Sequence, residues 1–288
     1  MGIEVKVLAD SIAPCGKRLI TYEAKYPRAI HSEIMTHRML TKSSASSRAI
    51  PVQKMIERVM KDPWIPEHIG KNQRGMQAAE QVSEDERVAA VQVWLRARDA
   101  AVDHALKLVE LGIHKQVVNR LLEPWMYIVV VISGTEWNNF FALRDHEAAE
   151  PHFQELARGM RAARKSSTPV PLKAGEWHLP YVEPWDRGVL WDRVRKDDCS
   201  HLEMCARHDN LLVRVSVARC ARVSYLTQDG RRDHDEDLAL HDRLLVQRPL
   251  HAAPAEHVAM ALDTDAASGN FRGFLQYRKT LPFECVEG

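Results

Sequence analysis

The segment WMYIVVVIS, residues 125–133, carries the strongest buried-strand pattern of this 288-residue chain. Its apolar run is continuous and rich in β-branched side chains, and it is too short to cross a membrane as a helix. Two other segments, IEVKVLAD (3–10) and RLITYEAKY (18–26), also predict strands, and the turn residues Pro14 and Gly16 between them predict a hairpin. These three segments form the predicted sheet.

Helical patterns surround the predicted strands. Pro27 suits the first turn of a helix that runs to about residue 40, and after a serine-rich loop Pro51 begins a second helix. Ser83 and Glu86 have the form of a capping box and start the longest helix, which Gly112 ends. Further helices are expected at residues 114–123, 135–146, 150–165, 208–226 and 233–247, and a short strand at 257–262.

Residues 165–190 carry four prolines and no apolar period, so we expect a loop or linker there. It would join residues 1–164 to residues 191–288. The mixture of strands and helices predicts an α+β fold in which a mixed or antiparallel sheet is flanked by helices.

The composition limits the possible partners. A net charge of +1 leaves no basic excess to follow the phosphates of a nucleic acid or a membrane surface, so we expect neither partner. The chain begins without the apolar run of a signal peptide, and no apolar run reaches the length of a membrane span. Five cysteines, an odd number at irregular spacing, indicate reduced thiols and a cytoplasmic protein.

Residues 36–51, THRMLTKSSASSRAIP, gather hydroxyls and cations between the first two predicted helices. One interpretation is structural, because cations suit a helix C-terminus and serines are common in loops. The other is an anion cradle in which Arg48 supplies a bidentate fork and the second helix supplies free backbone N–H groups. A nucleotide phosphate is its natural ligand. The hydroxyls would come from Ser43, Ser44, Ser46 and Ser47.

Arg144 follows the apolar residues FFAL on a predicted helix, within NNFFALRDH (138–146). It is either a packing or ion-pair residue, or an oriented fork that reads a planar partner such as a pyrimidine edge.

Four possible zinc ligands also lie within ten residues, but their spacing is not that of a structural zinc site. We therefore expect an ordinary helix surface there and no bound metal. These residues are Cys199, His201, Cys205 and His208. The chain also lacks the phosphate-loop, dinucleotide-binding, zinc-protease and nucleophile-elbow motifs, and no cysteine has an obvious catalytic partner in the sequence.

Two blocks of residues resemble the flavin-dependent thymidylate synthases. The family signature is Arg-His-Arg, seven variable positions, Ser, and an Arg two positions later. Here the run is Thr36-His37-Arg38, MLTKSSA, Ser46 and Arg48. The second family block is an arginine, a strand, and an Asn-Phe-Leu-x-Leu-Arg helix. Here it is matched by Arg120, residues 125–133, Asn139 and Arg144.

A third family block, Ala-Arg-Val-Ser followed by Pro-x-Glu-His, appears as residues 221–224 and 254–257. In the family this block precedes the other two, whereas here it follows them. The order therefore resembles a circular permutation, in which residues 191–288 complete the catalytic domain begun by residues 1–164, and residues 165–190 join the two portions.

The resemblance implies a reductive methylation of dUMP to dTMP. Methylenetetrahydrofolate would donate the carbon, and FAD, reduced by NADPH, would supply the hydride. It also implies a homotetramer with active sites at subunit interfaces.

The resemblance also implies roles for single residues. Arg144 would be catalytic, holding the pyrimidine and stabilising the charge that develops as C5 becomes nucleophilic. The implied nucleotide ligands are Ser46, Arg48 and Arg120, and the cradle hydroxyls of Ser44 and Ser47 extend this set. The implied flavin ligands are His37, Arg38, Asn139, Ser224 and His257, and His37 would also lie near the folate.

Three departures from the family pattern surround the predicted pocket. Thr36 replaces the first signature arginine, Ser44 stands in place of a Glu, and Glu33 stands in place of a Gln. Three functions therefore stay open. If Glu33 faces solvent, the substrate is still dUMP; if it points to the substrate, it favours a donor on the base edge and hydroxymethylation of dUMP or dCMP. The third is a nucleotide-binding protein that has lost its flavin site.

Overall fold

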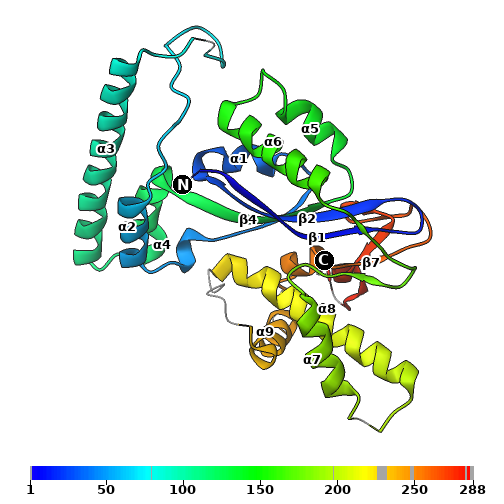
Figure 1. Ribbon diagram of the computed structural model, residues 1–288. Coiled ribbons are helices and arrows are strands. Elements are labelled where there is room, and N and C mark those ends of the chain that lie inside the picture. Colours follow the sequence, from blue (N-terminus) through cyan, green and yellow to red (C-terminus); the bar gives the residue numbers. More distant parts are fainter. Residues whose placement is uncertain are drawn as a thin grey trace.

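The computed structural model describes residues 2–78, 80–196, 198–225, 232–246, 250–282 and 284–285. The strands of its main sheet are β1 (Glu4–Ile12), β2 (Arg18–Pro27), β3 (Thr41–Ser44), β4 (Tyr127–Gly134) and β5 (Val170–Pro171). Their order is β3-β4-β2-β1-β5, and only β5 pairs in parallel (Figure 1). The hairpin, the strand at 125–133 and the α+β class are confirmed.

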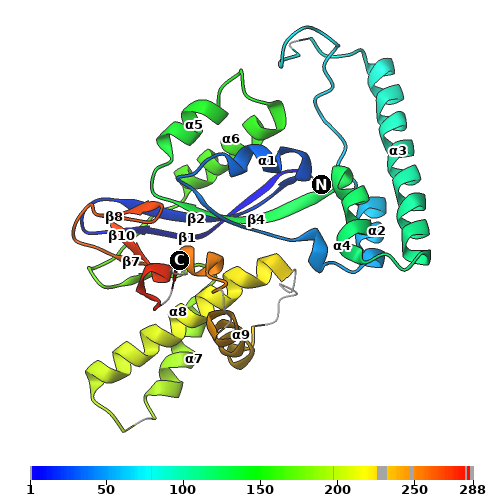
Figure 2. The ribbon, with the colours of Figure 1, turned by 180° about the vertical axis from the view of Figure 1, so that it is seen from behind.

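The faces of β2 and β4 separate two environments, because alternate residues of a strand point to opposite sides. Ile20 and Ile132 lie in a large apolar core, whereas the hydroxyls of Thr21 and Ser133 bond to each other on the other side. The first face is covered by α1 (His31–Met35), α5 (Asn138–Arg144) and α6 (Pro151–Ser166). The second is covered by α8 (His201–Tyr225), as Figures 1 and 2 show.

The first predicted helix is much shorter than expected. Helical structure is confined to a 3₁₀ turn, Arg28–Ile30, and to α1, so the prediction of a helix to about residue 40 is wrong. Thr36 ends α1, because its amide and its hydroxyl both donate to the carbonyl of Glu33. The Lys42 ammonium then donates to the carbonyl of His37 at 2.5 Å, which fixes the turn.

The serine-rich segment is not the loop that the sequence predicts. Its first half is the edge strand β3, which pairs with β4 from Thr41↔Ser133 to Ser44↔Val130. Its second half holds a 3₁₀ turn, Ser47–Ala49, and α2 (Val52–Lys61) follows as expected. The serine-rich composition suggested a loop. The hydrogen bonds between two strands come from backbone groups, however, and an edge strand tolerates small polar side chains.

The longest helix, α3 (Glu84–Glu110), stands beside the body of the protein (Figures 1 and 2). Its predicted capping box is present: Ser83 Oγ accepts from the Glu86 amide, and the Glu86 carboxylate accepts from the Ser83 amide. Gly112 has a φ of +73°, as the predicted helix end requires. Neither α3 nor any other helix within the described ranges has the length and apolarity to span a membrane.

The base of α3 packs on a second apolar core. It is shared with α2, with α4 (Lys115–Val118) and with a 3₁₀ helix, Asn119–Trp125. The helix predicted at 114–123 is therefore present in two parts.

The predicted linker, residues 165–190, contains ordered elements. It holds β5 and β6 (Trp177–His178), and α7 (Pro184–Val194) begins within it, so the expectation of a loop is wrong for these residues. The helices predicted beyond it are α8 and α9 (His234–Val246). Residues near the C-terminus form β7 (Ala259–Ala261), β8 (Ala267–Ser268), β9 (Phe271–Arg272) and β10 (Phe274–Gln276). The division of the chain into permuted portions stays a prediction.

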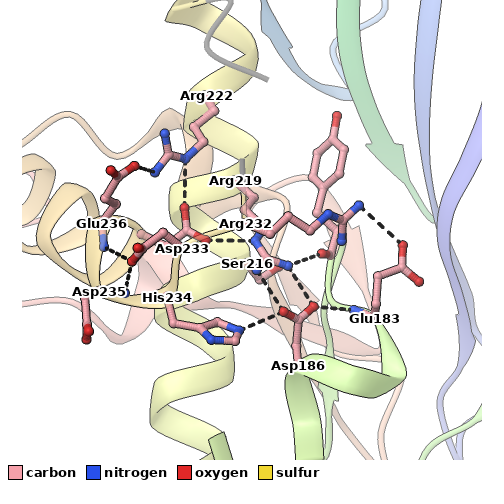
Figure 3. Close-up of polar contacts among 12 residues, drawn as sticks. Glu183, Asp186, Ser216, Arg219, Arg222, Arg232, Asp233, His234, Asp235 and Glu236 are labelled. Atoms are coloured by element: carbon pink, nitrogen blue, oxygen red, sulfur yellow. Dashed lines mark hydrogen bonds and ion pairs between the residues drawn. The ribbon is translucent and has the colours of Figure 1, made fainter. Parts of the chain in front are cut away.

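A buried ion-pair network joins α7, α8 and α9 (Figure 3). The Arg219 side chain is 6 % exposed and donates to Asp186 at 2.7 and 2.8 Å and to Asp237 at 2.9 Å. Arg222 donates to the other oxygen of Asp237 at 2.7 Å, and His234 Nε2 lies 2.8 Å from Asp186. Burying these charges is tolerated because each has close partners of opposite charge.

Candidate functional site

Arg144 lies at the end of α5, and its guanidinium joins two residues from distant parts of the sequence. Its Nε donates to His37 Nε2 at 2.9 Å, and its Nη1 donates to Glu33 Oε2 at 2.9 Å. Because a guanidinium only donates, His37 Nε2 must accept, which requires a neutral imidazole with its proton on Nδ1. The signature block and the Asn-Phe helix therefore meet at this arginine.

The surroundings keep His37 neutral. Burial, together with the positive charges of Arg144 and Lys42, lowers the pKa of His37 to about 4. Its ring lies nearly perpendicular to those of Phe140 and Phe153, with centroids 5.0 and 5.9 Å away. The Arg144 guanidinium lies over Phe153, 4.5 Å from the ring centroid. Packing therefore fixes both polar groups in place.

A cavity of about 540 Å³ opens beside this group. Its wall includes His37 and Arg144, and its rim includes Arg38 and Asn139, whose side chains are exposed. Of the predicted flavin ligands, three therefore share one cavity with the predicted catalytic arginine. Glu33 bonds to Arg144, but its side chain is 36% exposed and it does not line the cavity, so both of its predicted positions stay open.

The predicted phosphate ligands form a separate group. Ser47 Oγ donates to Glu123 Oε1 at 2.6 Å, and Arg120 Nη1 donates to the same oxygen at 2.8 Å. Arg28 lies 3.6 Å from the other oxygen of Glu123. Arg48 is exposed on the neighbouring 3₁₀ turn.

Glu123 is the residue that sequence analysis missed, although its spacing of three from Arg120 is a recognisable ion-pair signal. None of the phosphate ligands lines the cavity of Arg144. Ser44 is half-buried in β3, and Ser46 is half-buried directly before the 3₁₀ turn.

His257 lies on the opposite face of the sheet. Its Nδ1 is 2.8 Å from Ser133 Oγ, which bonds to Thr21 Oγ1, and Thr21 is 2.8 Å from His178 Nε2. Burial lowers the pKa of both histidines to about 3. His257 Nε2 is buried and has no hydrogen-bond partner among the described residues. The single chain therefore does not bring His257 into the cavity with Arg38 and Asn139.

Two further expectations concern α8. Ser224 lies in the last turn of this helix, and its side chain is outside the described part of the structure. The possible zinc ligands are not assembled: Cys205 lies 3.7 Å from His201, whereas His208 bonds to the carbonyl of Arg187. Within the described ranges, no three His, Cys, Asp or Glu side chains are grouped to hold a metal ion.

Comparison with known proteins points to one family. A family model described as thymidylate synthase complementing protein (Thy1) matches residues 17–170, just over half of the chain. This range holds the first two motif blocks and ends before the third, so the permuted order stays a prediction. No curated protein sequence matches the chain.

Solved structures are similar over part of the chain. One is a UMP/dUMP methylase, PolB from Streptomyces cacaoi, bound with 5-Br UMP. It has 16% sequence identity and a TM-score of 0.48, covering 56% of this chain and 88% of that one. Another is thymidylate synthase X (ThyX) from Helicobacter pylori with FAD and dUMP. It has 16% identity and a TM-score of 0.36, covering 51% of this chain and 67% of that one.

Proposed function

The chain belongs to the thymidylate synthase complementing protein (Thy1) family of flavin-dependent thymidylate synthase-like methyltransferases, and from this premise we propose that it converts dUMP to dTMP. Methylenetetrahydrofolate is the proposed carbon donor and NADPH the proposed reductant. The observation that carries the proposal is the geometry of Arg144, a permanent cation fixed by His37 and Glu33 at the wall of a cavity of about 540 Å³.

Arg144 suits the proposed catalytic role. Nε and Nη1 are used by His37 and Glu33, and Nη2 has no acceptor among the described residues. A pyrimidine carbonyl bound at Nη2 would place the charge that develops on the ring next to a fixed cation. Such pre-oriented charge stabilises a transition state more than the ground state.

The cavity also offers suitable groups for a flavin. Arg38 and Asn139 present exposed donors at the rim, and neutral His37 supplies an imidazole at the wall. Bound FAD would supply the hydride chemistry, and these three residues would hold and orient it.

His257 is a proposed flavin ligand that lies across the sheet from the cavity of its own chain. We therefore propose a cytoplasmic homotetramer in which neighbouring chains complete each site. Exposed apolar side chains support an interface near the end of α3: Leu106, Val109, Leu111, Ile113 and Val117.

The phosphate of dUMP is the proposed ligand of the group formed by Ser47, Arg48 and Arg120, with Ser44 and Ser46 at its edge. Arg48 is exposed there, and Arg120 is held by Glu123 at 2.8 Å. An incoming phosphate would compete with Glu123 for the Arg120 guanidinium, which offers it a bidentate fork.

A second candidate function is the hydroxymethylation of dUMP or dCMP. The observation that favours it is the contact of Glu33 with the proposed catalytic residue, because its carboxylate accepts a hydrogen bond from Arg144 at 2.9 Å. A carboxylate at a base edge prefers a donor, which is the N4 amino group of cytosine or N3–H of uracil.

Product analysis separates these functions. The purified chain is incubated with FAD, methylenetetrahydrofolate and either dUMP or dCMP, with and without NADPH, and the products are identified by mass. We expect dTMP from dUMP and only with NADPH. A product heavier by one oxygen and formed without NADPH would assign a hydroxymethylase. Nucleotide binding without flavin binding or any product would assign an inactive nucleotide-binding protein.

A further inference from the structure

A second cavity, of about 640 Å³, lies between α5 and the end of α6. It touches another face of α5 than the cavity of Arg144, and the two cavities share Asn138. Four of its seven lining residues are cationic and none is acidic: Arg18, Arg161, Arg164 and Lys165. Figure 1 shows α5 and α6 side by side over the sheet. The cavity is therefore a concentrated positive region next to the candidate site.

Two of these cations are already neutralised. Arg18 forms a bidentate ion pair with Asp10, with hydrogen bonds of 2.8 and 2.6 Å. Arg161 pairs with Asp145 at 3.0 Å. Within the described ranges, Arg164 and Lys165 have no carboxylate within 4.0 Å, so their charges are left to attract an anion.

Arg164 is the more unusual of the two. Its Nη1 is buried and has no hydrogen-bond partner among the described residues. Burial lowers the pKa of Arg164, and the neighbouring charge of Arg18 adds to this effect. A desolvated guanidinium donor without an acceptor is costly.

The helix dipole does not account for this arrangement. Both Arg164 and Lys165 lie in the last turn of α6, where cations are favourable. That effect explains the exposed Lys165, whose ammonium group needs no further partner. It does not explain why the Arg164 fork is turned inward without an acceptor.

We propose that this cavity binds a phosphate-bearing group through Arg164 and Lys165, with Arg161 and Asn138 beside it. A phosphate accepts several hydrogen bonds from a guanidinium fork and would satisfy the orphaned donor of Arg164. Because the two cavities share Asn138, the group would belong to a ligand that also reaches the cavity of Arg144. The phosphate of dUMP is already assigned to the group of Ser47, Arg48 and Arg120. The remaining phosphate-bearing ligands of the proposed reaction are NADPH and FAD, and this choice between sources rests on the proposed function.

The first test uses inorganic pyrophosphate as the probe and calorimetry on the full chain at fixed ionic strength. We expect binding that Arg164→Gln weakens at least tenfold and that exposed Lys165→Gln weakens about threefold. The matched control is Arg158→Gln, an exposed arginine of the same helix that pairs with Asp145 and does not line the cavity. It should change the affinity less than twofold. Equal affinity in the parent and Arg164→Gln would overturn the proposal.

Thermal unfolding separates this role from a structural one. If Arg164 binds a ligand and does not stabilise the fold, Arg164→Gln should unfold at the parental temperature or above it, because an unpaired, half-buried charge is removed. Pyrophosphate should raise the melting temperature of the parent and not that of the variant. A lower melting temperature for Arg164→Gln without ligand, together with unchanged pyrophosphate affinity, would mark the residue as structural and end the proposal.

The second test identifies the source by measuring the affinities of NADPH, FAD and dUMP for the parent and Arg164→Gln. We expect Arg164→Gln to bind one of the two dinucleotides at least tenfold more weakly than the parent does. Its affinity for dUMP should fall less than twofold. If Arg164→Gln lost affinity for pyrophosphate but kept the parental affinity for both dinucleotides, the proposal would be contradicted. All of these measurements are of binding and none needs turnover. A pyrophosphate site that depends on Arg164 would therefore be detected even if the chain did not methylate dUMP.

Discussion

Two arginines in this molecule show how the same side chain serves structure in one place and chemistry in another. Arg219 is 6 % exposed, and its guanidinium is enclosed by Asp186, Asp237 and the carbonyl of Tyr181. Figure 3 shows its contact with Asp186. Arg144 is 21% exposed, has one carboxylate and one neutral imidazole, and lies at a cavity. The first arginine is saturated by the fold. The second has a donor, Nη2, with no acceptor among the described residues, which leaves it for a ligand.

The two arginines also differ in the charges that surround them. In the network around Arg219, two buried carboxylates are paired with the arginine, so its removal would leave buried charge without its main partner. Around Arg144, Glu33 is 36% exposed and His37 is neutral, so no buried charge depends on the arginine. Removing Arg219 should therefore damage stability, and removing Arg144 should damage activity.

The largest effect is expected from Arg219→Ala. It would leave Asp186 and Asp237 buried without their main partner, which typically costs about 3–5 kcal/mol. Urea unfolding followed by circular dichroism measures the loss. The control on the same helix is Arg214→Ala, whose pair with Asp242 is partly exposed and should contribute about 0–1 kcal/mol. Similar losses in both variants would show that the buried network has no special role.

Arg144→Ala should have the opposite profile. Its turnover should fall about 10²–10³-fold, because a cation aimed at developing charge is typically worth about 3–4 kcal/mol. Its unfolding free energy should stay within about 1 kcal/mol of the parent, and its flavin content should not change. Arg144→Lys should recover little activity, because an ammonium group cannot replace the planar fork. Near-parental turnover of Arg144→Ala would exclude the proposed role.

Local signals made much of the fold predictable. The capping box of Ser83 and Glu86, the helix end at Gly112 and the buried run of β4 depend on neighbouring residues, so the sequence was enough. The length of α1 was not predictable in this way. It depends on one side-chain bond from Thr36 to the carbonyl of Glu33, which competes with continuing the helix.

The candidate site was predictable only in part. The motif resemblance identified His37 and Arg144, whose contact joins residues 107 positions apart. The buried chain from His257 through Ser133 and Thr21 to His178 was not foreseen, because its members come from four separate strands and loops. No local sequence pattern predicts which hydroxyl and which imidazole will meet when strands pair in the fold.

The buried histidines predict a loss of stability in acid. The folded-state pKa values of His178 and His257 lie at about 3, below the ordinary value of 6.5. Between these values the unfolded chain binds more protons, so stability is complete above pH of about 6.5 and falls as the pH decreases toward 3. Each group should contribute on the order of 1–2 kcal/mol between pH 7 and pH 5.

Urea unfolding at pH 7 and pH 5 tests this prediction. His257→Gln should reduce the difference between the two unfolding free energies. The control, His146→Gln, changes an exposed histidine and should leave the difference unchanged. An unchanged pH dependence in His257→Gln would contradict the proposed cause.

The smallest effect is expected from Glu33→Gln, and it bears most directly on the chemistry of Arg144. The pair is partly exposed, so the loss of its charge should cost less than about 1 kcal/mol of stability. The amide oxygen can still accept from Arg144 Nη1, which keeps the fork in place, while the preference for a base donor weakens. If the carboxylate accepts from the N4 amino group of cytosine, the ratio of kcat/KM for dCMP to that for dUMP should fall a few-fold. Glu136→Gln is the matched control, because Glu136 lines the cavity of Arg144 but bonds to Lys17 instead of Arg144, and it should leave the ratio unchanged. A ratio that moves in neither variant would show that Glu33 only positions Arg144, and a ratio that rises in Glu33→Gln would show that the carboxylate selects against cytosine.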